Sequence, residues 1–175
     1  MLTLADALEA LTSIRIASAT AIITEAVIDS RQAIPASLFV AIPGEKVDGH
    51  DFIAEAFKRG ASFALTQKET PGCRTLDLRD GLTTESPLDL SLPLCLRVDN
   101  TTSALQQIAR FWRRRLNLRV VGITGSVGKS TTKEMVAEVL GTRYRTLRSP
   151  GNLINEIGLP LTMLKLGAGY ERSVL

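Results

Sequence analysis

A β-rich run, a glycine-containing loop and a helical segment follow one another directly along residues 119–141. Val120–Thr124 is short and rich in β-branched residues, while Thr131–Leu140 repeats its apolar residues at helical spacing and ends before Gly141. A strand, a glycine-containing turn and a helix in that order begin an α/β nucleotide-binding domain. This segment therefore restricts the fold class to α/β more strongly than any other part of the chain.

The loop between these elements has the residues that a phosphate-binding loop needs. Gly125 and Gly128 allow the backbone to approach a ligand closely, so that its N–H groups can hold phosphate oxygens. Lys129 is predicted to reach the β- and γ-phosphates, and Ser130 to offer its hydroxyl to a Mg²⁺ that bridges them. The general pattern also has a glycine five residues before Gly128, where this chain has Ile123.

The first hundred residues predict a small mixed α/β domain. Apolar periodicity and capping residues, among them Thr3 and Gly60, predict helices at residues 2–11 and 51–59. A third helix is predicted to open at the N-cap cluster of residues 99–102 and to continue through Leu116. Continuous apolar runs predict strands at residues 38–42, 61–66 and 94–98. Residues 67–93 are rich in Pro, Gly, Ser, Thr and Asp and are predicted to be mostly loop, with a weak strand around 74–78.

Charge is distributed unevenly along the chain. Residues 1–100 have nine Lys/Arg against fourteen Asp/Glu, and residues 101–175 have twelve against four, so the two parts carry −5 and +8. No window approaches 18 consecutive apolar residues, so we expect no membrane insertion. Cys73 and Cys95 are too few for a disulfide scaffold and lack metal-ligand spacing, which is typical of free thiols in a reducing cytoplasm.

Three motifs, one of them made of three short stretches, resemble the Mur ligases, bacterial enzymes that build the peptide of cell-wall precursors, and they follow one another in the family's order. Thr124–Met135 is similar to their ATP loop, which also lacks the first glycine of the general pattern. Pro150–Thr162 is similar to the segment after the first helix of their ATPase domain. Asp29–Arg31, Leu38–Gly44 and Asp48–Phe52 are similar to their UDP-sugar-binding domain. Ser126 and the Lys-Glu-Met run look most like the member that adds D-alanyl-D-alanine.

The resemblance implies ATP and Mg²⁺ as cofactors and assigns residues to them. Lys129 would be catalytic and Ser130 would bind the metal. The residues implied for ATP are Gly125, Ser126, Val127, Gly128, Lys129, Ser130, Thr131, Asn152 and Asn155. The family usually has two adjacent asparagines in the later segment, and this chain has Ile154 in place of the first. From the residues alone, that stretch is a polar turn in which asparagines cap a helix.

The same resemblance implies that Ser30, Arg31, Gly49 and His50 bind the uridine diphosphate end of the substrate. Ser30 and Arg31 can donate hydrogen bonds to phosphate or uracil oxygens, and Gly49 and His50 would lie on a loop beside them. A purely structural interpretation stays open for each: Asp29 and Ser30 can form a turn, and His50 can cap the helix expected at residue 51.

The implied organisation is a UDP-sugar-binding domain at residues 1–98, a connecting helix at 99–118 and the beginning of an ATP-binding domain at 119–175. The implied reaction joins UDP-N-acetylmuramoyl-tripeptide to D-alanyl-D-alanine through an acyl phosphate, in a cytoplasmic enzyme of cell-wall synthesis that is monomeric at full length. Later catalytic elements of the family are not found in these 175 residues. We therefore expect the chain alone to be inactive.

Three other functions remain as alternatives. The first is the neighbouring ligase that adds the third residue of the peptide, which shares the loop and the N-terminal motif. The second is a non-catalytic nucleotide-binding module. The third is a nucleic-acid-binding protein, prompted by the arginines at 110–119 and 143–148. Few aromatic residues accompany those arginines, and Trp112 falls on an apolar stripe, so base stacking is not favoured and we expect no nucleic-acid partner.

Overall fold

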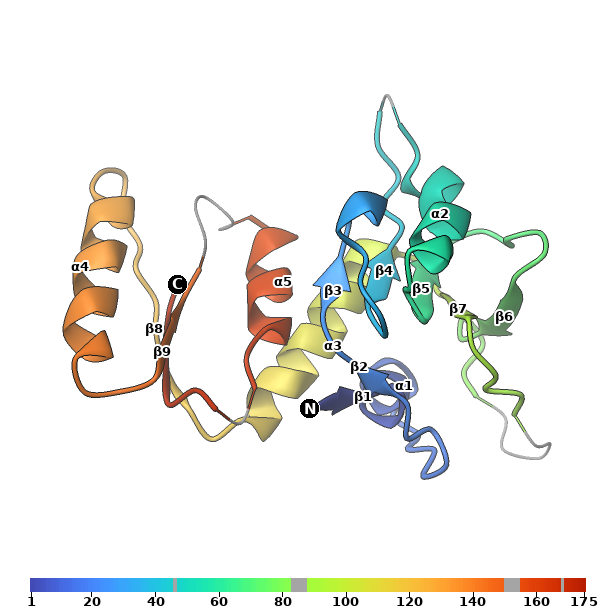
Figure 1. The fold of residues 1–175 in the computed structure, drawn as a ribbon, viewed down its shortest axis with the longest axis horizontal. Helices are drawn as coiled ribbons and strands as arrows, with labels where there is room; N and C mark the ends of the chain where they lie inside the picture. Colours follow the sequence, from blue (N-terminus) through green and yellow to red (C-terminus); the bar gives the residue numbers. More distant parts are fainter. Residues whose placement is uncertain (46, 83–87, 150–154, 168) are drawn as a thin grey trace. The chain divides into compact units, whose positions relative to one another are not determined.

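The structure, a computed structural model, describes residues 1–45, 47–82, 88–149, 155–167 and 169–175 (Figure 1). The chain divides into two compact units, Met1–Ile108 and Ala109–Leu175, and the division falls inside helix α3 (Thr101–Arg115). Each unit contains parallel strands and helices. The predicted α/β class is therefore confirmed.

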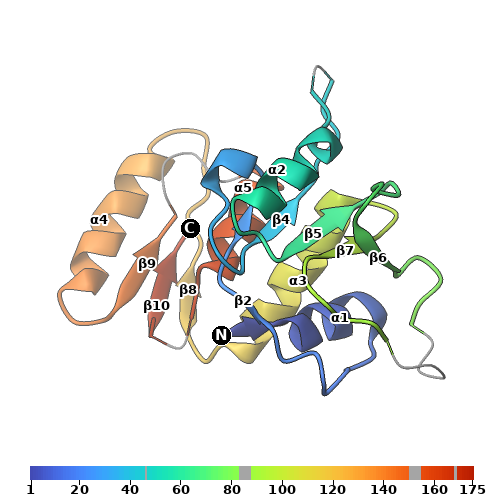
Figure 2. The same ribbon diagram turned by 45° about the vertical axis from the view of Figure 1, so that its right-hand side comes forward.

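The first unit is built on a parallel sheet of five strands in the order β3-β4-β5-β7-β6 (Figure 2). Phe39, Ala64 and Cys95 are aligned across its three central strands. Every residue of β4 and β5 is buried, which explains why these strands are continuous apolar runs rather than alternating patterns. The strands are β3 (Ala26–Val27), β4 (Leu38–Val40), β5 (Phe63–Thr66), β6 (Arg74–Asp77) and β7 (Leu94–Arg97).

Side chains cap the start of the first α-helix and of both 3₁₀ turns in this unit. Thr3 caps α1 (Leu4–Thr12), as the sequence predicts, and Asp6 completes a capping box that was not predicted. The helix expected at residue 51 begins earlier, as the 3₁₀ turn η2 (Gly49–Phe52), and continues as α2 (Ile53–Lys58). The remaining elements are β1 (Leu2–Thr3), its antiparallel partner β2 (Ile22–Ile23) and the 3₁₀ turn η1 (Ser30–Gln32).

The second unit has a parallel sheet of three strands in the order β8-β10-β9. Helix α4 (Lys129–Gly141) begins two residues before the predicted start and contacts β9 and β10. The indole N–H of Trp112 donates to the carbonyl oxygen of Leu166 at 2.7 Å. The polar group of this buried side chain, which lies on the apolar face of α3, is therefore hydrogen-bonded. The other elements are β8 (Arg119–Val121), β9 (Thr146–Arg148), α5 (Gly158–Leu164) and β10 (Arg172–Val174). Across the described part of the chain, the helices lack the length and apolar character needed to cross a bilayer.

The two cysteines of the first unit differ in exposure, and this difference predicts their reactivity. Cys95 is buried in the sheet, and burial raises the pKa of its thiol to about 12, whereas Cys73 is half-buried. Because the thiolate is the nucleophile, we expect a disulfide reagent at pH 8 to titrate one thiol in the folded chain and two after denaturation. In the Cys73→Ser variant, the reagent should titrate no thiol in the folded chain and one after denaturation. Rapid reaction of two thiols in the folded wild-type chain would contradict the burial of Cys95.

Candidate functional site

The predicted phosphate loop leaves the carboxyl edge of the second sheet and enters α4. After β8 the backbone stays beside β10, and the N–H of Ile123 donates to the carbonyl oxygen of Leu175 at 2.7 Å. The chain then turns through Gly125 and Gly128, whose φ angles of 146° and 81° favour glycine. Gly128 is the N-cap of α4 and has no side chain to cap it, so the first N–H groups of the helix are available to an anionic ligand.

Lys129 is the first residue of α4, and its ammonium bends back over the loop. Its Nζ donates to the carbonyl oxygen of Gly125, so the charge is held inside the turn that the backbone makes. Ser130 and Thr131 follow in the first turn of the helix and are exposed, and Val127 at the tip of the loop is 90% exposed. The structure therefore places all residues of the predicted loop in one turn and the start of one helix.

Lys133 and Glu134 of the Lys-Glu-Met run, for which the sequence predicted no contact, help to fix the position of α4 on the sheet. Lys133 is buried, and its Nζ donates to the carbonyl oxygen of Ser149 at 2.8 Å, at the carboxyl end of β9. On the exposed side, Arg148 of β9 pairs with Glu134 and, at 3.5 Å, with Glu138 of the same helix. Lys133 lies one helical turn before the buried Ala137, on the same face of α4, and this spacing is the signal that could have identified the first contact.

Asn155, which was predicted to contact the nucleotide, lies just before α5. Its Oδ1 accepts hydrogen bonds from the backbone N–H groups of Gly158 at 2.6 Å and Ile157 at 3.3 Å. The side-chain oxygen therefore caps the start of α5, as the residues considered alone suggest. The second predicted asparagine, Asn152, lies outside the described residues.

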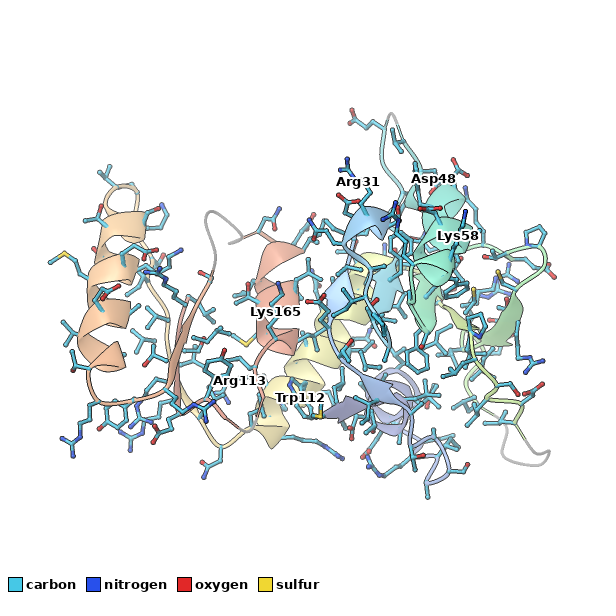
Figure 3. The ribbon with its side chains drawn as sticks, viewed as in Figure 1. Arg31, Asp48, Lys58, Trp112, Arg113 and Lys165 are labelled. Carbon is cyan, nitrogen blue, oxygen red and sulfur yellow. The ribbon has the colours of Figure 1, made fainter. Side chains whose placement is uncertain are left out.

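Ser30 and Arg31 of the N-terminal motif lie in η1, directly after its N-cap Asp29. The carboxylate of Asp29 accepts from the backbone N–H of Arg31 at 3.0 Å and from its Nη2 at 2.7 Å. These hydrogen bonds from Arg31 hold the pKa of Asp29 at about 2. Ser30 is buried, whereas Arg31 projects from η1 with 79% of its side chain exposed (Figure 3). The motif is a turn that presents an exposed guanidinium.

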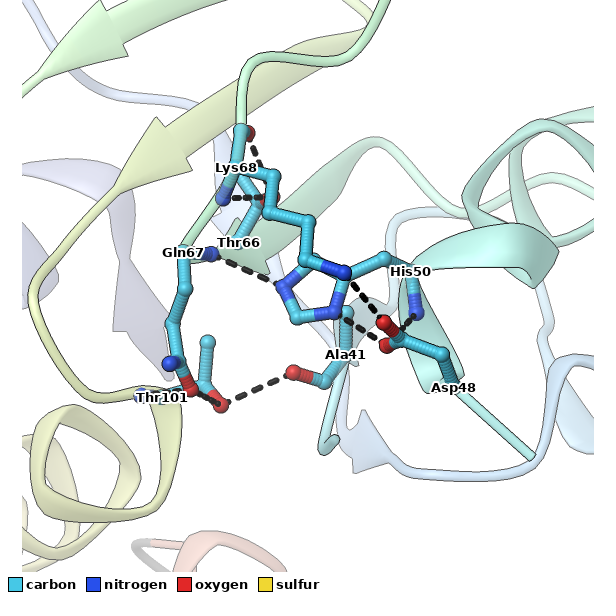
Figure 4. A network of polar contacts seen from close by, with 7 residues as sticks. All are labelled: Ala41, Asp48, His50, Thr66, Gln67, Lys68 and Thr101. Carbon is cyan, nitrogen blue, oxygen red and sulfur yellow. Dashed lines mark hydrogen bonds and ion pairs between the residues drawn. The ribbon is translucent and has the colours of Figure 1, made fainter. Parts of the chain in front are cut away.

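Gly49 and His50 of the same motif lie in η2, against the carboxyl end of β4. A β-carbon on Gly49 would lie 2.7 Å from the N and O atoms of Ile42, so the backbone passes close to the end of that strand. The side chain of His50 is only 7% exposed, and each ring nitrogen contacts a protein group: Asp48, and the backbone N–H of Gln67 (Figure 4). Neither contact of the ring was predicted from the sequence.

A cavity of about 360 Å³ lies at the carboxyl ends of β6 and β7 and the start of α3. It is lined by polar and apolar groups, including Arg79, Asp99 and Ser103. None of the four residues predicted to bind the uridine diphosphate end is among its lining residues. The described residues contain no group of three His, Cys, Asp or Glu side chains that could hold a metal ion by themselves.

Comparison with known protein families gives two matches, one in each unit. Residues 22–74 match the model described as Mur ligase family, catalytic domain. Residues 123–175 match the model described as Mur ligase middle domain. The first match includes the Asp29–Arg31 and Asp48–Phe52 motifs, and the second includes the phosphate loop, so the models cover the segments on which the resemblance was based.

Characterised relatives and solved structures agree with these matches. The UDP-N-acetylmuramoyl-tripeptide–D-alanyl-D-alanine ligases of Bacillus subtilis and Escherichia coli are 39% and 37% identical to this chain over 147 residues, which is 84% of the chain. The chain spans only 29% and 28% of their lengths.

A crystal structure of MurF from Acinetobacter baumannii superposes on 98% of the chain, and on 34% of its own length, with a TM-score of 0.71 and 29% identity. MurF ligase from Thermotoga maritima, in complex with ADP, superposes on 86% of the chain and 31% of its own length, with a TM-score of 0.66 and 32% identity. The motifs, the parallel sheets and these likenesses together show that the chain belongs to the Mur ligase family.

Proposed function

We propose that this chain forms the first part of an ATP-dependent ligase that adds D-alanyl-D-alanine to UDP-N-acetylmuramoyl-tripeptide in cytoplasmic peptidoglycan synthesis. The observation that carries the proposal is the phosphate loop, with Lys129 and the uncapped start of α4 in one turn. The relatives from B. subtilis and E. coli, which bear the name of this activity, support the choice of substrates. The ADP in the T. maritima MurF structure supports the choice of nucleotide.

In the proposed reaction, ATP converts the carboxylate of the tripeptide, which has no good leaving group, into an acyl phosphate that has one. The carboxylate of the tripeptide attacks the γ-phosphorus of ATP, which forms an acyl phosphate and releases ADP. The amine of D-alanyl-D-alanine then attacks the acyl carbon, phosphate departs, and the amine proton passes to solvent or to a base. The loop contributes by orienting the phosphates with backbone N–H groups and by neutralising their charge with Lys129.

Magnesium would be held mainly by the phosphates of ATP. Ser130 is exposed in the first turn of α4, where its hydroxyl fits a single protein ligand to such an ion. When bound, Mg²⁺ supplies charge neutralisation between neighbouring phosphate oxygens. The residues proposed to contact the nucleotide are Gly125, Ser126, Val127, Gly128, Lys129, Ser130, Thr131, Asn152 and Asn155.

The uridine diphosphate end is proposed to bind in the first unit. Arg31 is the strongest candidate for a phosphate contact, because its guanidinium is exposed although it is oriented by Asp29. Ser30 would add a hydroxyl, and Gly49 and His50 would form the neighbouring loop. The proposed organisation is a substrate domain at 1–98, a connecting helix at 99–118 and the beginning of the ATP-binding domain at 119–175.

The activity is tested by supplying both candidate acceptors to the full-length product of the gene that encodes this chain. With ATP, Mg²⁺ and D-alanyl-D-alanine, we expect UDP-N-acetylmuramoyl-tripeptide to yield the pentapeptide product and one ADP per bond, detected by mass spectrometry and phosphate release. The 175-residue chain alone should form none. Product from the dipeptide substrate and a free diamino acid would identify the third-residue ligase instead, and nucleotide binding without any product would identify a binding module.

The role of Lys129 predicts a loss of ATP affinity on removal of its charge. A charge-assisted hydrogen bond to phosphate is worth about 1.5–3 kcal/mol, so Lys129→Met should weaken ATP binding roughly tenfold to a hundredfold. Isothermal titration of the 175-residue chain with ATP and Mg²⁺ measures this effect. Lys165→Met, which removes an exposed lysine of the same unit, is the control and should bind like the wild type. Equal affinities for all three would contradict the assigned role.

The exposed guanidinium of Arg31 predicts an electrostatic contribution to UDP binding. Arg31→Leu should weaken the binding of uridine diphosphate by about tenfold at low salt, and the difference should shrink as ionic strength rises because exposed charges are screened. Arg74→Leu removes another exposed arginine of the same unit, paired with Asp89 and not with Asp29, and should leave the affinity unchanged. A loss for Arg31→Leu that does not depend on salt would argue against a phosphate contact.

A further inference from the structure

His50 lies in a hydrogen-bonded network at the carboxyl ends of β4 and β5 (Figure 4). Its Nδ1 lies 2.5 Å from Oδ1 of Asp48, the N-cap of the same 3₁₀ turn. Its Nε2 lies 2.9 Å from the backbone nitrogen of Gln67, the first residue after β5. The ring therefore joins two segments that are 17 residues apart in sequence.

These contacts specify one tautomer of the imidazole. A backbone N–H can only donate, so Nε2 must accept from Gln67 and cannot carry a proton. The single ring proton of a neutral histidine is then on Nδ1, where it is donated to the carboxylate of Asp48. Both nitrogens are used by the protein, which leaves no ring donor or acceptor for a substrate.

Asp48 stays ionised in this arrangement and can therefore keep accepting that proton. Its Oδ2 pairs with the ammonium of Lys68, and its Oδ1 also accepts from the backbone N–H of His50 at 3.0 Å. The hydrogen bond from Lys68, followed by those from His50, keeps the pKa of Asp48 well below its ordinary value. The charged groups around the imidazole are thus Asp48 and Lys68, with Asp51 near enough to Lys68 to affect it.

The network continues from Gln67 into the start of α3. Oε1 of Gln67 accepts from the backbone N–H of Thr101 at 3.3 Å, and the hydroxyl of Thr101 lies 3.1 Å from the same atom. Thr101 is fully buried, and its hydroxyl donates to the carbonyl oxygen of Ala41 at 2.8 Å. The ends of β4 and β5, the loop at Asp48 and the start of α3 are therefore joined side by side.

We propose that His50 is a positioning residue, which fixes the loop at Gly49 to the end of β5 through an Nδ1–H imidazole and does not bind the substrate with its ring. The proposal rests on the proposed function, because it assumes that this end of the sheet receives the uridine diphosphate end of the substrate. Gly49, which precedes His50 in η2, and the backbone of Gln67 are the groups whose placement depends on His50.

The tautomer can be measured directly because His50 is the only histidine in the chain. In ¹⁵N–¹H correlation spectra of the ¹⁵N-labelled 175-residue chain, we expect a pyrrole-type shift for Nδ1 and a pyridine-type shift for Nε2. Addition of uridine diphosphate should leave both types unchanged. A proton on Nε2, or a change of tautomer on addition of uridine diphosphate, would overturn the proposal. This readout needs no ligase activity, so it is independent of the proposed function.

Substitutions separate positioning from direct contact. His50→Gln can place an amide oxygen near the Nε2 position and accept from Gln67, whereas His50→Asn reaches only the Nδ1 position and His50→Ala reaches neither. We expect His50→Ala and His50→Asn to weaken the binding of UDP-N-acetylmuramoyl-tripeptide about tenfold, which corresponds to the loss of one hydrogen bond, and His50→Gln to stay within about twofold of the wild type.

The control is Glu69→Gln, which changes an exposed residue just beyond β5 and should bind like the wild type. Thermal unfolding of each variant separates weaker binding from loss of the fold. If His50→Gln binds as weakly as His50→Ala while both remain folded, the imidazole contacts the substrate and the positioning role is wrong. If the wild-type chain itself does not bind the UDP-sugar, the proposed function fails, whereas the tautomer result stands separately.

Discussion

Each unit has a main sheet of parallel strands, so within each sheet the carboxyl ends of the strands lie along the same edge. Parallel strands must be joined by crossover connections, and the loops at that edge are where α/β proteins place their ligands. In the first unit the ends of β4 and β5 lead to His50 and Gln67, and in the second the end of β8 leads to the phosphate loop. Strand direction thus brings together, within each unit, groups that are far apart in sequence.

Features specified by neighbouring residues could be predicted from the sequence. The cap that Thr3 makes on α1 depends only on residues of the next turn, and the phosphate loop depends on its two glycines and the helix that follows. Asn155 is instructive, because its local pattern indicated a cap while the family resemblance indicated a nucleotide contact, and its oxygen caps α5. Strands β3 and β9 were not predicted, because each is only two or three residues long and neither lies in a continuous apolar run such as the one that contains β4.

Contacts between distant segments could not be predicted in this way. The tautomer of His50 is specified by a backbone N–H that becomes its neighbour only when β4 pairs with β5. Part of the positive charge of the second unit is likewise used in contacts within the unit. The guanidinium of Arg113 donates to the carbonyl oxygens of Leu116 and Leu118, and that of Arg172 stacks on the ring of Tyr144. Some arginines that the sequence alone makes candidates for binding a polyanion therefore stabilise the unit instead.

The buried ammonium of Lys133 has a mechanical consequence. Lys133 donates a buried hydrogen bond to the carbonyl oxygen of Ser149, which joins α4 to the residue after β9. On the exposed side, the ion pair between Arg148 and Glu134 joins the same two elements. A shift of α4 relative to β9 would break the hydrogen bond of the Lys133 ammonium where water cannot replace it, which costs free energy. α4 and the end of β9 are therefore expected to move as one rigid element.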